Sequence, residues 1–137
     1  MKEYCGIFGI FGHPEASELT TLGLHALQHR GEESSGIASG DGDQLHIHTG
    51  MGHVADVFGG LDISSNLPGH LAIGHNRYST TGSDTLSNSQ PFIAQFRQGS
   101  IAVAHNGNII NTIQLREELE EEGAIFQTCL LYTSPSP

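Results

Sequence analysis

The residue best suited to covalent chemistry in this 137-residue sequence is Cys5, which stands four residues after the encoded start and precedes a glycine. Removal of residues 1–4 would place a free α-amine beside its thiol. An α-amine has a pKa of about 7.7–8.0 and a thiol of about 8.5, so the amine can accept the thiol proton near neutral pH. The placement is therefore compatible with a propeptide and a self-contained nucleophile and base. The commoner role of a lone cysteine in a strand is packing as a small hydrophobe.

Two of the four arginines, Arg30 and Arg77, are each expected in a loop directly after an ordered element, beside histidine or asparagine. A guanidinium group can hold a carboxylate with two parallel hydrogen bonds. Such arginines suit a substrate that carries a carboxylate. The alternative is a structural arginine that binds loop carbonyls, which is the better interpretation of Arg30 taken singly.

The dipeptide Asn106-Gly107 follows a predicted strand directly and admits two interpretations. It can form a type I′ hairpin turn, which the spacing alone favours. It can instead aim an amide side chain and a backbone N–H at a developing oxyanion.

Nine histidines raise the question of a metal site, but their spacing argues against one. His25 and His29 lie one helical turn apart, and alanine stands where a His-Glu-x-x-His hydrolase has its glutamate. His46 and His48 share one strand face without a nearby carboxylate and cysteine to complete a tetrahedral set. We therefore expect no metal site. Phosphate binding is not expected either, because the early glycines match neither dinucleotide nor Walker spacing.

Charge and composition narrow the function classes further. Five basic residues are scattered among fifteen acidic ones, for a net charge of -10, so nucleic acid and anionic membranes are not expected partners. No apolar run approaches the roughly 18 residues of a spanning helix. The start is too short and too rich in glycine for a secretory signal, so a cytoplasmic location is expected by default. Only two cysteines occur, which argues against a disulfide framework.

The hydrophobic pattern predicts a layered domain that mixes helices and strands. Strands are expected over residues 5–11, 36–39, 45–49, 71–75, 92–96 and 101–105, with helices over 15–28 and 54–58. Residues 61–69 and 76–82 read as loops, and 98–99 as a turn. A last helix, capped by Thr112 and ended by Gly123, should carry its run of glutamates on a solvated face.

Several ordered blocks resemble the glutaminase domain of the amidophosphoribosyltransferase family, over residues 5–128. The blocks are Cys5-Gly-Ile-Phe-Gly-Ile10, Gly23-Leu-His-Ala-Leu-Gln-His-Arg-Gly-Glu-Glu33, Gly36-Ile-Ala38, Ile73-Gly-His-Asn-Arg-Tyr-Ser-Thr-Thr-Gly82, Gln90-Pro-Phe92 and Ala104-His-Asn-Gly-Asn108. The resemblance implies an α+β fold of the N-terminal-nucleophile hydrolase type. This is a four-layer αββα sandwich of two mainly antiparallel sheets, expected here to be incomplete at the C-terminus.

The resemblance also implies roles for single residues. Cys5 matches the nucleophile released by propeptide cleavage, and Asn106 and Gly107 match the oxyanion donors. Arg77 matches the arginine that binds the α-carboxylate of glutamine. The remaining expected pocket residues are Thr80, Thr81 and Gly82, with Arg30 in a structural or positioning role.

The activity implied is hydrolysis of glutamine through a γ-glutamyl thioester, with ammonia passed on to form phosphoribosylamine in purine synthesis. Full-length relatives are homo-oligomers with a phosphoribosyltransferase domain that is absent here. The Mg²⁺ and, in some members, the iron–sulfur cluster of the family are associated with that missing part, so no cofactor is expected in this chain. The alternatives are the glutaminase domain of another class II amidotransferase, which the Leu27-Gln-His-Arg-Gly31 block disfavours, and an inert domain in which Cys5 stays buried.

The sequence departs from the family after Thr128. Relatives continue with a segment whose aspartate binds the α-amine of glutamine, whereas no aspartate follows Asp84 here. We therefore expect a propeptide over residues 1–4, a partial glutaminase domain over 5–128, and an aberrant or disordered tail over 129–137. Loss of the aspartate would cost about 1.5–3 kcal/mol of glutamine binding.

Overall fold

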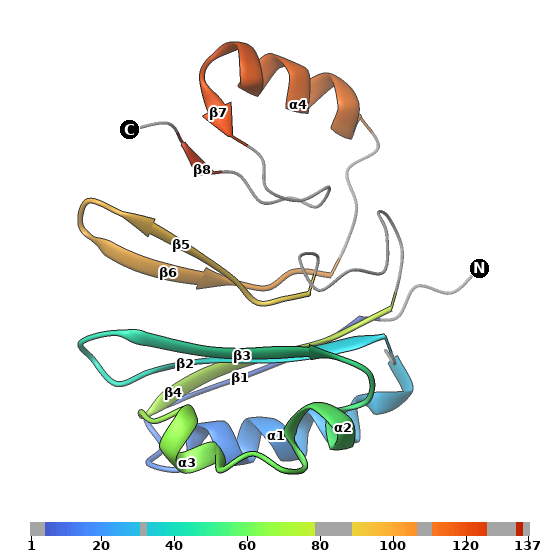
Figure 1. Cartoon of the computed structure of the whole chain (residues 1–137), viewed down its shortest axis with the longest axis vertical. Helices are drawn as coiled ribbons and strands as arrows, with labels where there is room; N and C mark the ends of the chain where they lie inside the picture. Colours follow the sequence, from blue (N-terminus) through green and yellow to red (C-terminus); the bar gives the residue numbers. More distant parts are fainter. Residues whose placement is uncertain (1–4, 31–32, 79–88, 107–110, 126–133, 136–137) are drawn as a thin grey trace.

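The layered arrangement of the chain is visible in the computed structural model, which describes residues 5–30, 33–78, 89–106, 111–125 and 134–135. Three helices lie under a four-stranded sheet, a two-stranded hairpin lies above that sheet, and a fourth helix lies beyond the hairpin (Figure 1). This succession of helix, sheet, sheet and helix confirms the predicted α+β sandwich.

The four-stranded sheet consists of β1 (Gly6–Phe11), β2 (Ser34–Gly40), β3 (Leu45–Met51) and β4 (Leu71–Arg77). Its strand order is β1-β4-β2-β3, and each neighbouring pair is antiparallel. The last strand in sequence, β4, is therefore flanked by β1 and β2, so residues from three distant segments meet at its C-terminal end.

Helices α1 (Ala16–Ala26), α2 (Val54–Phe58) and α3 (Ile63–Asn66) cover one face of this sheet, and a short 3₁₀ turn, η1 (Gln28–Arg30), follows α1. Burial of apolar side chains between the helices and the sheet is the main stabilising contribution to this half of the fold. The buried cluster consists of Ala16, Leu24, Ile37, Val54, Phe58, Leu67 and Ala72.

The second sheet is the antiparallel hairpin of β5 (Phe92–Phe96) and β6 (Gly99–Val103). Helix α4 (Thr112–Glu121) follows, and the two-residue strands β7 (Ala124–Ile125) and β8 (Ser134–Pro135) pair with each other. The glutamates of α4 are exposed, as the sequence predicts. Gly123, expected to end this helix, has a φ of 99° and donates its N–H to the Glu120 carbonyl.

Two expected loops contain regular structure. Within residues 61–69, α3 forms, and the hydroxyls of Ser64 and Ser65 donate to the Asp62 carboxylate beside it. Strand β4 also continues through Asn76 and Arg77, which we expected in a loop, because both residues pair with β2. Asn76 and Arg77 are buried in the sheet despite their polarity, whereas the polar side chains of α3 are exposed to solvent.

The position of β6 was predicted two residues too far along the chain. The ladder pairs Phe96 with Gly99, so Gly99 begins the strand instead of closing the turn. At the other end, the backbone groups of His105 bond to side chains rather than to a strand. In α4, Thr112 is the first helical residue, and Asn111 occupies the capping position.

No helix among the described residues is both long and apolar enough to cross a membrane.

Candidate active site

Strand β4 presents two chemically different faces. Ala72, Gly74 and Asn76 face the helices: Ala72 lies in the core, a Cβ on Gly74 would meet Leu24, and the Asn76 amide donates to the Leu24 carbonyl at 2.8 Å. Because side chains alternate along a strand, Ile73, His75 and Arg77 lie on the opposite face, toward the hairpin. Arg77 is thus a buried strand residue, 3% exposed, rather than the loop residue that we expected.

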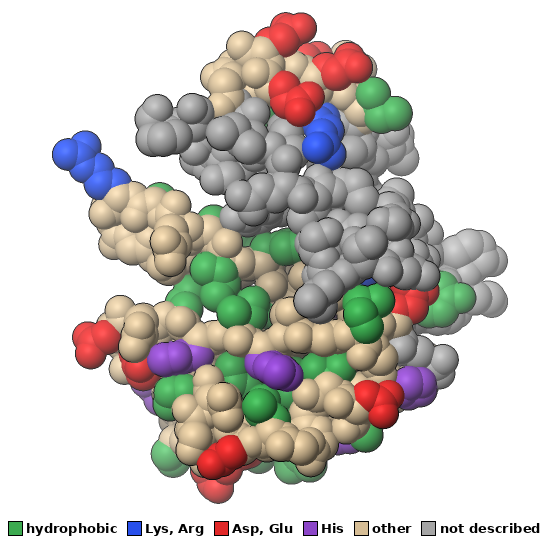
Figure 2. All heavy atoms as spheres, in the orientation of Figure 1, with side chains coloured by type: hydrophobic (Ala, Val, Ile, Leu, Met, Phe, Trp, Pro, Cys, Tyr) green, Lys and Arg blue, Asp and Glu red, His purple; other side chains and the backbone are tan. Residues whose placement is uncertain are grey.

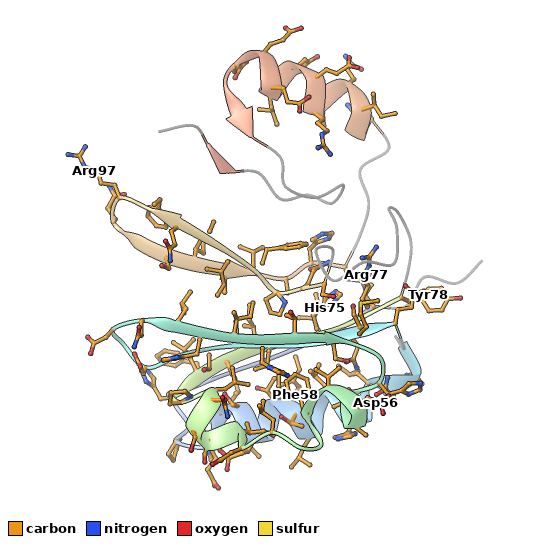
Figure 3. All side chains as sticks on the ribbon, viewed as in Figure 1. Asp56, Phe58, His75, Arg77, Tyr78 and Arg97 are labelled. Carbon is orange, nitrogen blue, oxygen red and sulfur yellow. The ribbon has the colours of Figure 1, made fainter. Side chains whose placement is uncertain are left out.

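Cys5 lies directly before β1, and strand pairing determines its neighbours. Ile7 pairs with His75 and Gly6 with Asn76, so alternation puts Cys5 on the face of His75 and Arg77. The side chain is 7% exposed, and its Sγ donates to the carbonyl of Tyr78 at 3.7 Å. Arg77 and Tyr78 lie together at the end of β4 (Figure 3). The thiol therefore lies beside the polar C-terminal end of β4.

Asn106 reaches the same place from the other sheet. Its Nδ2 donates to the backbone carbonyl of Cys5 at 3.2 Å, across 101 positions of sequence. The element after β6 in the described chain is helix α4, not a strand that pairs with β6. This arrangement disfavours the hairpin interpretation of Asn106-Gly107 and brings the Asn106 amide next to Cys5.

Two buried side chains hold the residue before Asn106. The Nε2 of His75 lies 3.0 Å from the carbonyl of His105, and the N–H of His105 donates to Oε1 of Gln90 at 2.7 Å. A carbonyl can only accept, so His75 carries its proton on Nε2. His75 is fully buried and Gln90 is 3% exposed.

The electrostatics of this region favour neutral imidazoles. The pKa of His75 is lowered from 6.5 to about 4, mainly by burial and in part by the charges of His105 and Arg77, while the hydrogen bond to the His105 carbonyl raises it. Burial and Arg77 also lower the pKa of His105. Near neutral pH, Arg77 is therefore the positive charge of this cluster, which suits an anionic group more than a cation.

The remaining expected site residues lie wholly or partly outside the described residues. Arg30 ends η1, but its side chain lies outside the described part. Thr80, Thr81, Gly82 and Gly107 are also outside the described residues. Their roles stay predictions.

His75 and Gln90 are not among the site residues expected from the sequence. A signal for His75 was present, since it lies two positions from Arg77 on an expected strand and hence on the same face. No local pattern identifies Gln90, because its partner His105 is 15 positions away and on another strand end.

The described residues offer no ligand set for a metal ion or an iron–sulfur cluster. Among the described residues, no group of three or more histidines, cysteines, aspartates and glutamates could hold a metal ion. An iron–sulfur cluster is usually held by four cysteine thiolates, and this sequence has two cysteines. The residues present therefore do not fit the cluster of some family members.

Known proteins similar to this chain include glutamine amidotransferases, as the resemblance implies. Residues 75–130 match a glutamine amidotransferase domain family. Amidophosphoribosyltransferase 3, chloroplastic, of Arabidopsis thaliana is 55% identical over 128 residues, which are 93% of this chain and 24% of that protein. The amidophosphoribosyltransferase of Lacticaseibacillus casei is 48% identical over 128 residues, again 93% of this chain and 66% of that protein.

Two solved structures share the fold. One, described as the allosteric regulatory enzyme of purine biosynthesis, has a TM-score of 0.83 and 47% identity. The chain belongs to the amidophosphoribosyltransferase family. The second structure, glutamine phosphoribosylpyrophosphate amidotransferase from B. subtilis, has a TM-score of 0.80 and 46% identity. Each match covers 89% of this chain and 26% of the solved chain.

The matched part corresponds to the glutamine amidotransferase domain of these enzymes. The chain spans about a quarter of the length of the Arabidopsis relative and of both solved chains.

Proposed function

We propose that the chain is a glutaminase that uses Cys5 as an N-terminal nucleophile, after removal of residues 1–4. The observation that carries this proposal is the 3.2 Å hydrogen bond from Asn106 Nδ2 to the Cys5 carbonyl. It brings an amide donor beside a buried thiol from the far end of the domain. A donor of this kind can stabilise an oxyanion that forms next to the nucleophile.

The proposed reaction follows from these groups. The Cys5 amine takes the thiol proton, and the thiolate attacks the side-chain carbonyl carbon of glutamine. Asn106 and Gly107 donate to the resulting oxyanion. The ammonium of Cys5 then returns its proton to the leaving nitrogen, which departs as ammonia and leaves a γ-glutamyl thioester. Water, deprotonated by the same amine, attacks the thioester and releases glutamate and the free thiol.

Glutamine recognition is assigned to the residues near this centre. Arg77 would bind the α-carboxylate, because its guanidinium provides positive charge beside neutral histidines. Thr80, Thr81 and Gly82 would line the same pocket, and Arg30 would position the nucleophile. Charge-assisted hydrogen bonds of this kind contribute about 1.5–3 kcal/mol each.

We further infer that the ammonia serves a phosphoribosyl acceptor in the whole protein. One solved relative is named a glutamine phosphoribosylpyrophosphate amidotransferase, and another an enzyme of purine biosynthesis. The transfer requires a phosphoribosyltransferase domain, and we propose a homo-oligomer as the assembly. A cytoplasmic location stays a prediction, since several plant relatives are named chloroplastic.

Processing is tested first, by intact mass spectrometry of the purified 137-residue chain. We expect a species that begins at Cys5, because only that species has the free amine that the mechanism needs. The same sample should release ammonia and glutamate from glutamine in equal amounts. A chain that keeps residues 1–4 and releases no ammonia would contradict the proposal and favour the inert domain.

Substitutions test the assigned roles in the same assay. Asn106→Ala should lower kcat by about 10²–10³-fold, the usual effect of losing an oxyanion donor. Cys5→Ala should abolish turnover and keep the wild-type circular dichroism spectrum. The matched controls are Asn66→Ala on the exposed α3 and Cys129→Ser, and both should retain turnover. Unchanged hydrolysis in Cys5→Ala would refute the nucleophile assignment.

A further inference from the structure

The backbone that leads into Asn106 is held by side chains instead of by a strand. Strand β6 ends at Val103, two residues before His105, and the next described element is α4. A segment outside the ladder depends on other partners for its backbone N–H and C=O groups. The partners of His105 are therefore decisive for the position of Asn106.

Both polar backbone groups of His105 have a buried side chain as partner. His75 binds the carbonyl at 3.0 Å from β4, and Gln90 binds the N–H at 2.7 Å from the segment before β5. The imidazole of His105 itself makes no hydrogen bond within the described residues. Among the described residues, His105 is therefore held by hydrogen bonds to its backbone and not to its side chain.

The two partners are themselves held at one level of the four-stranded sheet. His75 pairs with Gly36 of β2 in the sheet register. A Cβ on Gly36 would overlap the backbone carbonyl of Gln90, so Gln90 lies directly against β2 at that point. His75 and Gln90 therefore both lie beside Gly36 of β2, and together they bind the His105 backbone. We call this pair the clamp, and it links the four-stranded sheet to the segment after β6.

We propose that His75 and Gln90 are positioning residues for Asn106, and that they set the place of its amide beside Cys5 by holding the His105 backbone. This inference rests on the proposed glutaminase function for its kinetic consequences. A displacement of about 1 Å at a reacting centre can cost about 10²-fold in rate. The clamp residues need no contact with glutamine to have such an effect.

The kinetic test uses pairs of substitutions in the full 137-residue chain. His75→Leu removes the donor to His105 and should lower kcat by about 10-fold to 10²-fold with little change in KM. His75→Gln keeps a donor at a similar reach and should recover most of the rate. Gln90→Met and Gln90→Glu form the equivalent pair for the acceptor. The matched control is His48→Leu. It also removes a hydrogen bond from a histidine Nε2 to a carbonyl, that of Val57 at 3.1 Å, but this bond does not involve the segment that leads into Asn106.

A double-mutant cycle separates positioning from general damage to the fold. If His75 acts through Asn106, His75→Leu should have little further effect on kcat in an Asn106→Ala background. The rate of Cys5 alkylation by iodoacetamide should be similar in His75→Leu and the wild type, because the thiol does not depend on the clamp. An equal loss of kcat in both backgrounds, or a matching loss of alkylation rate, would overturn the inference.

Hydrogen exchange provides a readout that does not require turnover. In the NMR spectrum, His75→Leu and Gln90→Met should speed exchange at the His105 backbone amide and shift the side-chain amide signal of Asn106, whereas His48→Leu should leave both unchanged. If the wild type lacks glutaminase activity, the proposed function fails and this measurement still decides the positioning role. Unchanged exchange and an unchanged Asn106 signal in both clamp variants would overturn that role.

Discussion

Residues on β4 alternate between the two faces of the four-stranded sheet, and the polar side chains on the two faces have different hydrogen-bond partners. Asn76, fully buried, accepts from the Ser35 hydroxyl at 2.8 Å and donates to the Leu24 carbonyl at 2.8 Å. His75, on the other face, donates to His105 and stays neutral because of its burial. Each of these buried side chains has at least one defined hydrogen-bond partner, which offsets part of the cost of its burial.

The buried imidazole predicts a specific dependence of stability on pH. The pKa of His75 is 6.5 in the unfolded chain and about 4 in the folded one, so the unfolded state binds more protons between these values. The free energy of unfolding should therefore fall as pH is lowered from 6.5 to 4, by on the order of 3 kcal/mol from this residue. Urea unfolding at several pH values measures the loss.

The comparison that assigns this effect uses His75→Gln, which cannot titrate in that range. Its loss of stability between pH 6.5 and pH 4 should be clearly smaller than that of the wild type. Some loss should remain, because burial lowers the pKa of His105 as well. An identical pH dependence in the two proteins would show that His75 is not the group responsible.

At the scale of elements, α1 and β4 form the contact on which the site depends. Leu24 is fully buried between the helix and the sheet, and its carbonyl accepts from Asn76. A Cβ on Gly74 would lie 2.9 Å from Leu24 Cδ1, so the glycine allows the helix to approach the strand closely. The helix thereby supports the strand whose opposite face carries His75 and Arg77.

Leu24→Ala should destabilise the domain by about 2–5 kcal/mol, because it leaves a cavity in the core. The matched control is Leu22→Ala on the same helix, where the side chain is 64% exposed, and a change within about 0.5 kcal/mol is expected there. Urea unfolding of both variants at neutral pH measures the difference. Equal effects of the two substitutions would contradict the described packing of α1.

At the scale of the whole molecule, exposed apolar side chains on the hairpin favour self-association of the chain, and its acidic net charge opposes it. The face of the β5–β6 hairpin with Phe96, Ile101 and Val103 is about half exposed, with fractions of 52%, 48% and 44%. Acidic side chains gather on α4, and apolar ones around the hairpin (Figure 2). The net charge of -10 should hold copies of the chain apart at low salt.

We expect reversible self-association that strengthens with salt. The Debye length falls from about 10 Å at 0.1 M to about 3 Å at 1 M, which screens the repulsion and leaves apolar contact to act. The double substitution Ile101→Thr, Val103→Thr should weaken association and keep strand propensity. Sedimentation velocity at both salt concentrations measures the self-association. The control is Leu22→Gln, which removes an exposed apolar side chain from α1 instead of from the hairpin. A wild-type monomer under both conditions would contradict the expectation.

The local pattern of residue types alone was sufficient to locate most of the helices and strands. Alternating or β-branched runs located β1, β3 and β5, and helical spacing located α1, α2 and α4 to within a few residues. The pattern failed at Asn76 and Arg77, because polar residues in a strand between two partners look like a loop. It also failed at β6, since hydrophobicity does not reveal that His105 bonds to side chains instead of a neighbouring strand.

For the site, the sequence by itself determined the chemical types: a cysteine near the start, an asparagine before a glycine, and arginines suited to a carboxylate. Only the tertiary structure decided which of them meet. The antiparallel pairing of β1 with β4 puts Cys5 on the face of Arg77, and the approach of the second sheet brings Asn106 to Cys5 across 101 positions. These contacts arise from strand register and sheet packing, which join distant segments and leave no periodic signal along the chain.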